Sequence, residues 1–213
     1  VSIPRQPISY ILDDFRQVYK NKRFLGMALA LPMVSMPLML WIALSPVMLV
    51  EELGFSSMQY GLAQFPVLGG LILGNIVLIK IIDKLALGKS VLMGLPIMLL
   101  GTVVLLAGVI WQDYLIWCLI AGMTLISFGE GISFSVLYRF ALMSSEVSKG
   151  TVAAAVSMLL MFSFFIIIEL VRIMYEQYHL WAYAVACFIL IALWFSFPRA
   201  MLKQILQERK QRG

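Results

Sequence analysis

The stretch YLIWCLIAGMTLISFGEGISFSVLY, residues 114–138, decides the fold class of this chain. Glu130 is the one charged residue in it, and a glycine stands on either side of that carboxylate. An apolar run of more than about 18 residues can cross the roughly 30 Å hydrocarbon core of a bilayer as a helix. Five other runs in the chain have this character, so the sequence predicts an all-α integral membrane protein with six transmembrane helices. The predicted spans are residues 24–49, 58–82, 90–111, 114–139, 151–175 and 179–198.

The composition excludes a separate soluble domain. Of the 213 residues, 62% are hydrophobic and only 13% are charged. A soluble domain of ordinary composition is about half apolar and about one quarter charged. The predicted six-span bundle occupies residues 24–198 and leaves no room for a second folded unit.

Residues 1–23 are predicted to form an interdomain linker followed by an amphipathic helix. The opening VSIPRQP is punctuated by prolines, as linkers are. Ile8, Leu12, Phe15 and Tyr19 then fall on one helical face, which is typical of a helix that lies on a membrane surface. A linker and a surface helix at the start of the sequence indicate the middle of a longer protein.

The basic residues predict the orientation of the chain. Six spans place both termini on one side, and every one of the sixteen Lys and Arg residues except Arg172 falls on that side. Because basic residues concentrate on the cytoplasmic side of membrane proteins, we expect both termini to be cytoplasmic in a bacterial inner membrane. Residues 199–213 would then form a basic cytoplasmic tail. Basic flanks that meet anionic lipid account for the net charge of +5 without nucleic acid.

The motifs of an intramembrane enzyme are absent from the sequence. A serine protease of this size would need a Ser on a G-x-S-x-G turn and a His at matching depth, whereas the single histidine, His179, falls at the end of a span. Cys118 and Cys187 form no CxxC pair, and His and carboxylate residues are not clustered as metal ligands are. We therefore expect no enzymatic activity, no metal and no cofactor.

Glu130 is the candidate for a functional charge inside the membrane. It lies nine residues from the cytoplasmic end of its span, a depth of roughly 14 Å at about 1.5 Å per residue. Arg172 is roughly 33 Å deep on the same measure, so no cation of this chain reaches Glu130. A lone carboxylate in an apolar environment favours its protonated form, which suits a proton carrier.

The helical face around Glu130 predicts a binding surface for lipophilic cations. It combines soft, aromatic and acidic side chains, namely Met123, Ser127, Glu130, Phe134 and Leu137. We take Met123, Ser127, Glu130 and Phe134 as candidate cavity residues and Glu130 as the candidate for proton coupling. A protonated glutamate that only packs against a neighbouring helix is the alternative.

Other residues in the spans have structural interpretations. Glu169 and Arg172 stand three residues apart on one helix and are predicted to form an ion pair. Prolines in the first span should kink or locally unwind it. Small residues should let helix backbones approach in the second and fifth spans. These small residues are Gly61, Gly69, Gly70, Gly74, Ala153, Ala154, Ala155 and Ser157.

Three segments resemble the second half of the MdfA-type multidrug transporters of the major facilitator superfamily. They are PLMLWIALSPVML at residues 37–49, YGLAQFPVLGGLILGN at 60–75 and SKGTVAAAVSMLLMFSF at 148–164. The segment GNIVLIKIIDKLALGK at 74–89 is similar to the loop motif of that superfamily. The motif residues are Gly74, Asp83, Lys84, Gly88 and Lys89.

The resemblance implies a proton-coupled drug antiporter of twelve spans, of which this chain would be the C-terminal six-helix half. The partners would be membrane lipid, protons, small lipophilic drugs and an N-terminal six-span half, because the cavity of such transporters lies between the halves. The family's main proton-coupling carboxylates belong to that other half, and its residue at the position of Glu130 is apolar. The substrate-contacting positions implied by the family are Met39, Ile42, Ser157, Met161 and Phe164. A six-span structural or channel subunit that associates with its own copies is the alternative.

Overall fold

The computed structural model describes residues 8–84 and 88–196, and within them the chain is helical and contains no strand. The predicted linker at residues 1–7 and the predicted basic tail at residues 199–213 lie outside the described residues. The elements are α1 Ile8–Lys20, α2 Lys22–Ser45, the π-helix η1 Pro46–Glu52, α3 Ser57–Ile81, α4 Lys89–Ile110, the 3₁₀-helix η2 Gln112–Tyr114, α5 Leu115–Met143, α6 Lys149–Tyr178 and α7 Leu180–Ser196.

Five of the helices are long and apolar enough to cross a membrane: α2 with η1, α3, α4, α5 with η2, and α6. The helix α7 is equally apolar but has 17 described residues. The all-helical membrane class predicted from the sequence is therefore confirmed for the described part of the chain. The count of six spans stays a prediction.

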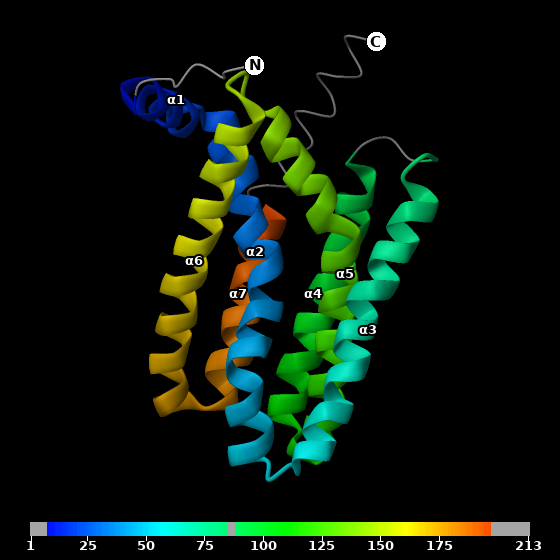
Figure 1. Ribbon diagram of the computed structural model, residues 1–213. Coiled ribbons are helices and arrows are strands. Elements are labelled where there is room, and N and C mark those ends of the chain that lie inside the picture. Colours follow the sequence, from blue (N-terminus) through cyan, green and yellow to red (C-terminus); the bar gives the residue numbers. More distant parts are fainter. Residues whose placement is uncertain (1–7, 85–87, 197–213) are drawn as a thin grey trace.

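The helix α1 lies across one end of the bundle, as Figure 1 shows. We call this the α1 end and the opposite end the far end. Tyr19 anchors α1, because its hydroxyl donates a hydrogen bond to the carbonyl of Ala155 on α6 at 3.0 Å. Burial raises the pKa of the Tyr19 phenol, so the group keeps the proton that it donates. On the same predicted apolar face, Phe15 packs against the core while Leu12 stays exposed.

The first span carries its prolines in two different settings. Pro32 and Pro37 lie inside α2, and Pro46 begins the seven-residue π-helix η1. Proline has no backbone N–H and cannot continue the ordinary helical ladder. The wide turn then closes with the N–H of Leu53, which donates to the carbonyl of Met48 at 3.1 Å. The local unwinding expected of this span therefore takes the form of a π-helix at its far end.

The helix α5 packs against α4, α3 and α2, and glycines let it approach the first two closely. A Cβ added to Gly101 on α4 would lie 2.7 Å from the carbonyl oxygen of Gly122 on α5, and a Cβ on Gly122 would lie 2.8 Å from that of Gly101. On the α3 side, a Cβ on Gly131 would lie 2.5 Å from the carbonyl oxygen of Leu71. Real side chains do not fit at such distances, so these helix pairs meet backbone to backbone.

The glycines of α3 divide into two pairs. A Cβ on Gly70 would lie 2.5 Å from the carbonyl oxygen of Thr124, and one on Gly74 would overlap the carbonyl oxygen of Phe128. Nothing lies within 4 Å of a Cβ added to Gly61 or Gly69. The prediction that all four glycines permit close approach is therefore wrong for Gly61 and Gly69, which face away from α5.

Arg172 on α6 contacts two carboxylates near the far end. Its Nη2 atom lies 2.6 Å from Oε1 of Glu169, and its Nε atom donates to Oε2 of the same residue at 3.0 Å. Its Nη1 atom lies 2.9 Å from Oε1 of Glu176. The pair with Glu169 is a two-point fork, which is the geometry that guanidinium and carboxylate groups prefer.

We expect Gly70→Ala to destabilise the protein by about 1–3 kcal/mol, the usual cost of forcing extra volume into a packed contact. Gly69→Ala is the matched control, one residue away and in open space. It should leave stability unchanged or raise it, because alanine favours helix over glycine by up to about 1 kcal/mol. The measurement is the melting temperature in detergent. Equal melting temperatures for the two variants would contradict the close contact of α3 with α5.

We expect Glu169→Gln to lower the yield of folded protein more than Glu176→Gln does. The first change removes the negative charge and one of the two acceptor oxygens of the fork, whereas the second leaves the fork intact. A cation without its partner is costly within a membrane span. The measurement is the monodisperse fraction after extraction from membranes. A larger loss for Glu176→Gln would show that the fork is not what holds Arg172.

Candidate functional site

Three of the four residues predicted on α5 lie inside the bundle. Met123 and Ser127 are completely buried, and Glu130 is 5% exposed. Phe134 is partly buried and stacks on Tyr138 with 6.2 Å between the ring centroids. The predicted stripe therefore lies in the interior of this bundle, and Phe134 is its one partly accessible member, because Leu137 is again completely buried.

The rotation of α5 explains why Glu130 is buried. Its neighbour Gly129 faces α4 and its neighbour Gly131 faces α3. Met123 stands seven residues before Glu130, which is about two helical turns, so the two side chains share one face. The Sδ atom of Met123 accepts a hydrogen bond from the hydroxyl of Tyr183 on α7 at 2.7 Å. That hydroxyl also lies 3.3 Å from the carbonyl oxygen of Pro37 on α2, so Glu130 lies on the α5 face that is turned to α2 and α7.

Several buried polar atoms near the middle of α5 have no hydrogen-bond partner among the described residues. They are Oγ of Ser127, Oε2 of Glu130 and Oγ of Ser133, which recur every three residues. An unsatisfied buried polar group costs about 1–3 kcal/mol, and more if it is charged. A neutral, protonated Glu130 is the least costly state of this site. Alternatively, an ionised Glu130 could hold a cation that enters from outside the chain.

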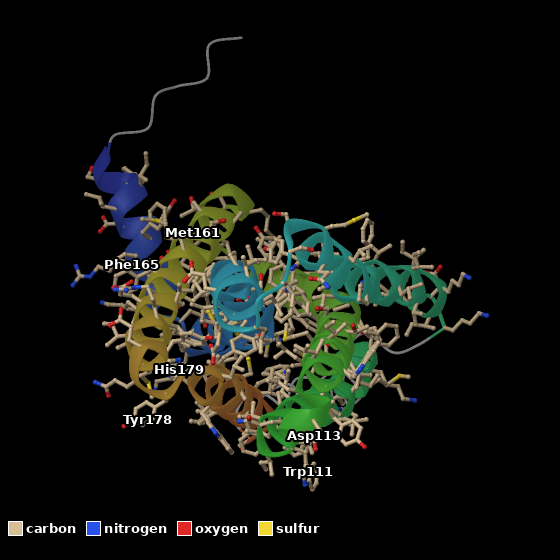
Figure 2. The ribbon with its side chains drawn as sticks, turned by 90° about the horizontal axis from the view of Figure 1, so that it is seen from below. Trp111, Asp113, Met161, Phe165, Tyr178 and His179 are labelled. Atoms are coloured by element: carbon tan, nitrogen blue, oxygen red, sulfur yellow. The ribbon has the colours of Figure 1, made fainter. Side chains whose placement is uncertain are left out.

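The predicted residues of α2 and α6 lie in a different setting. Ile42 is 53% exposed and Met161 is 63% exposed, Ser157 is exposed, and Met39 and Phe164 are partly buried. Figure 2 shows Met161 beside Phe165 on α6. The structure therefore does not bring the buried α5 residues and the exposed α6 residues into one surface.

Two polar contacts that the sequence analysis missed join α2 to α3 near the far end. The indole Nε1 of Trp41 donates to Oε1 of Gln64 at 2.8 Å, and the hydroxyls of Ser45 and Tyr60 lie 3.2 Å apart. The amide nitrogen of Gln64 is buried and has no partner among the described residues. The available signal was Tyr60 and Gln64, two polar residues four apart in an apolar span.

A cavity of about 310 Å³ lies on the α3 and α5 side of this contact. It was not predicted, because its lining residues come from different parts of the chain. They are Phe55, Gln59, Leu62, Ala63, Pro66, Trp117 and Ile120.

The described residues of the predicted loop motif lie in different settings. Gly74 is buried inside α3, where it meets the backbone of α5, so its glycine requirement comes from helix packing. Asp83 and Lys84 are exposed after the end of α3, and Gly88 begins α4 with φ of 94°. The assignment of Gly74 to the loop motif stays a prediction, and a positive φ at Gly88 is what a turn glycine supplies.

In residues 8–84 and 88–196 we find neither a cluster of metal-binding side chains nor a disulfide. No group of three His, Cys, Asp or Glu side chains in this part of the chain could hold a metal ion. Cys118 and Cys187 are free thiols on α5 and α7.

Comparison with known proteins finds close relatives, although no protein-family model matches the chain. The chain is 71% identical over 209 residues to the chloramphenicol resistance protein CraA of Acinetobacter baumannii, covering 98% of this chain and 51% of that protein. It is 36% identical over 162 residues to the multidrug transporter MdfA of Yersinia pestis bv. Antiqua, covering 76% of this chain and 40% of that protein. It is 38% identical over 157 residues to the MdfA of Escherichia coli O6:H1, covering 74% of this chain and 38% of that protein.

These relatives are named for drug resistance and drug transport, and none of the three names denotes an enzyme. The chain spans about half the length of CraA and about two fifths of the MdfA proteins. The apolar helices agree with a multi-pass membrane protein. Over the segment that it shares with these relatives, the chain is similar to CraA and to the MdfA multidrug transporters, which confirms the resemblance to MdfA-type transporters that the sequence indicated.

Proposed function

We propose that this chain is the C-terminal half of a proton-coupled multidrug efflux antiporter for lipophilic cationic or neutral drugs. The observation that carries the proposal is the 71% identity to a chloramphenicol resistance protein over 98% of the chain, with coverage of about half of that protein. A six-span half that needs an N-terminal six-span half to transport accounts for both numbers, because the drug cavity of such transporters lies between halves.

The charge distribution supports an orientation with both termini in the cytoplasm of a bacterial inner membrane. In the described residues the α1 end holds nine basic residues, whereas the far end holds Arg172 alone. The nine are Arg16, Lys20, Lys22, Arg23, Lys80, Lys84, Lys89, Arg139 and Lys149. Since basic residues concentrate on the cytoplasmic side, the α1 end is the cytoplasmic end in this proposal and the far end faces the periplasm.

Drug contact in this proposal comes first from the accessible residues of α2 and α6. Ile42, Ser157 and Met161 are exposed in this half, and flexible methionine side chains adapt to ligands of different shapes. Met39 and Phe164 are partly buried and pack against the core. An N-terminal half that covers these residues would close one wall of the cavity.

Glu130 supplies the proton site of this proposal. It is buried, it lies on the α5 face turned to α2, and its Oε2 atom has no partner among the described residues. A carboxylate in this setting can be neutral with a proton or ionised beside a cation, and the two states exclude each other. That exclusion is the basis of exchange between a proton and a cationic drug. The movement that would open Glu130 to the cavity is part of the proposal.

We expect residues 1–213 alone, reconstituted in liposomes, to show no proton-driven efflux of a lipophilic cation such as tetraphenylphosphonium. Co-expression with the N-terminal half should restore efflux, because the cavity then has both walls. The mass of the purified complex distinguishes a pair of unlike halves from a self-associated channel subunit. Efflux by the chain alone as a homo-oligomer would reject the half-transporter and favour the alternative.

We expect Glu130→Gln in the complete transporter to weaken binding of a cationic drug by about tenfold or more, which corresponds to about 1.4 kcal/mol. Binding of a neutral drug should change little. In the parent protein cation binding should fall as the pH falls, because protonation removes the negative charge of Glu130. The Gln variant cannot titrate, so its cation affinity should vary less with pH.

The measurement for this prediction is the dissociation constant of each drug against pH. Glu146→Gln is the matched control, because it removes an exposed carboxylate from the turn between α5 and α6. Identical curves for Glu130→Gln and its parent with both drugs would leave Glu130 as a buried packing residue.

A further inference from the structure

A second group of polar residues joins two helices at the far end of the bundle. The hydroxyl of Tyr175 on α6 donates a short hydrogen bond to Oε2 of Glu52 on η1. The Nδ1 atom of His179, which follows α6, lies 3.9 Å from Oε1 of the same carboxylate. The rings of Tyr175 and His179 meet edge to face, with 6.0 Å between their centroids. One carboxylate of the first span is thus held by two side chains that come more than 120 residues later.

Unusual backbone on both sides of this contact positions its members. Glu52 is the last residue of the π-helix η1, and π-helical turns are frequently found at functional sites. His179 has φ of 49° and is the only non-glycine residue with a positive φ among the described residues. Such a conformation is unfavourable for a side chain and persists only where the surrounding structure holds it. Its N–H donates to the carbonyl of Tyr175 at 2.9 Å, which ends α6 and turns the chain into α7.

The contact is open to the solution at the far end. Glu52 and His179 line a cavity of about 240 Å³. The other lining residues are Val109, Gln112, Leu115, Tyr178, Leu180 and Trp181, from the ends of α4, η2, α5, α6 and α7. Figure 2 views this end and shows His179 and Tyr178 at the turn between α6 and α7, with Asp113 and Trp111 at the turn between α4 and α5. Protons can therefore reach Glu52 and His179 directly.

Among the side chains of this contact, His179 is the one whose charge can change from neutral to positive. η1 contributes the carboxylates Glu51 and Glu52, α6 contributes Arg172, Glu176 and the phenols of Tyr175 and Tyr178, and η2 contributes Asp113. Arg172 is engaged by Glu169 and Glu176, and residues 180–196 of α7 hold no charged side chain. Protonation turns a neutral imidazole into a cation, so a protonated His179 places a positive charge beside the Glu52 carboxylate, 3.9 Å away.

We infer that Glu52, Tyr175 and His179 are positioning residues that hold the far ends of α2 and α6 together, and that they hold them more tightly when His179 is protonated. The hydrogen bond from Tyr175 supplies the constant part of the contact and the ion pair supplies the part that depends on pH. The role in transport rests on the proposed function. If the far end faces the periplasm, acid outside the cell favours closure of this half at that side.

The test measures the distance between the two helix ends in the full-length protein. Spin labels are placed in a cysteine-free background at Val50 on η1 and Gln177 on α6, both exposed, and the distance distribution is recorded between pH 5.5 and pH 8. We expect the ratio of the short-distance to the long-distance population to rise about two- to fivefold at acid pH, the effect of one ion pair at a half-exposed site.

The variants separate the charge from the hydrogen bond. His179→Asn keeps a residue type that tolerates positive φ but cannot gain a charge, so it should abolish the pH dependence, as should Glu52→Gln. Tyr175→Phe should lower the short-distance population at every pH and keep the pH dependence. Glu51→Gln is the matched control, because it removes the adjacent carboxylate and leaves the contact intact.

Persistence of the parent's pH dependence in His179→Asn would overturn the inference, and so would an effect of Glu51→Gln as large as that of Glu52→Gln. Drug efflux measured on the same proteins keeps the two proposals apart. Absence of efflux from the parent would reject the proposed function, whereas the distance measurement would still decide whether His179 controls the contact.

Discussion

The backbone contact of α5 with α4 and α3 is the constraint on which the rest of the bundle depends. Within a bilayer the apolar surfaces of helices gain little from leaving lipid, so close packing and hydrogen bonds hold helices together. Gly101 and Gly122 bring α4 against α5, and Gly74 and Gly131 bring α3 against α5. Because glycines on two faces of α5 must each meet a particular neighbour, the rotation of α5 about its own axis is fixed. That rotation turns Glu130 toward α2 and α7.

The same rotation accounts for the chemistry proposed for Glu130. A carboxylate on the lipid side of α5 would be costly and without function, and one in open water would bind protons weakly. In the observed position it is buried one helical turn from Ser127 and one from Ser133, whose hydroxyls also have no partner among the described residues. The Oε2 atom of Glu130 has no partner among the described residues, so a proton, a ligand or water can occupy this position. In the proposed function, the charge of Glu130 therefore depends on whether a proton or a cation occupies this position.

The helix α2 connects this interior to the far end. Its prolines weaken the regular ladder, and its last turns widen into η1, where Glu52 meets Tyr175 and His179. The polar contacts of Trp41 with Gln64 and of Ser45 with Tyr60 tie the same region to α3. The far end of α2 is therefore bonded on both sides, whereas Figure 1 shows α3 and α6 spreading apart toward the α1 end.

The sequence by itself determined the membrane class, the places of the apolar helices, the one-sided charge and the spacing that pairs Glu169 with Arg172. Each of these follows from local properties: the length of an apolar run, its flanking charges, or neighbours on one helix. Only the tertiary structure decided that Gly70 and Gly74 face α5 while Gly61 and Gly69 do not, that Gly74 belongs to a helix contact, and that Met161 is exposed while Met123 is buried. It also decided that Glu52 meets Tyr175 and His179. A membrane helix that is apolar on all sides has no polar face in its sequence that would predict which side turns to the other helices. Contacts between distant parts of the chain therefore set its rotation about its axis.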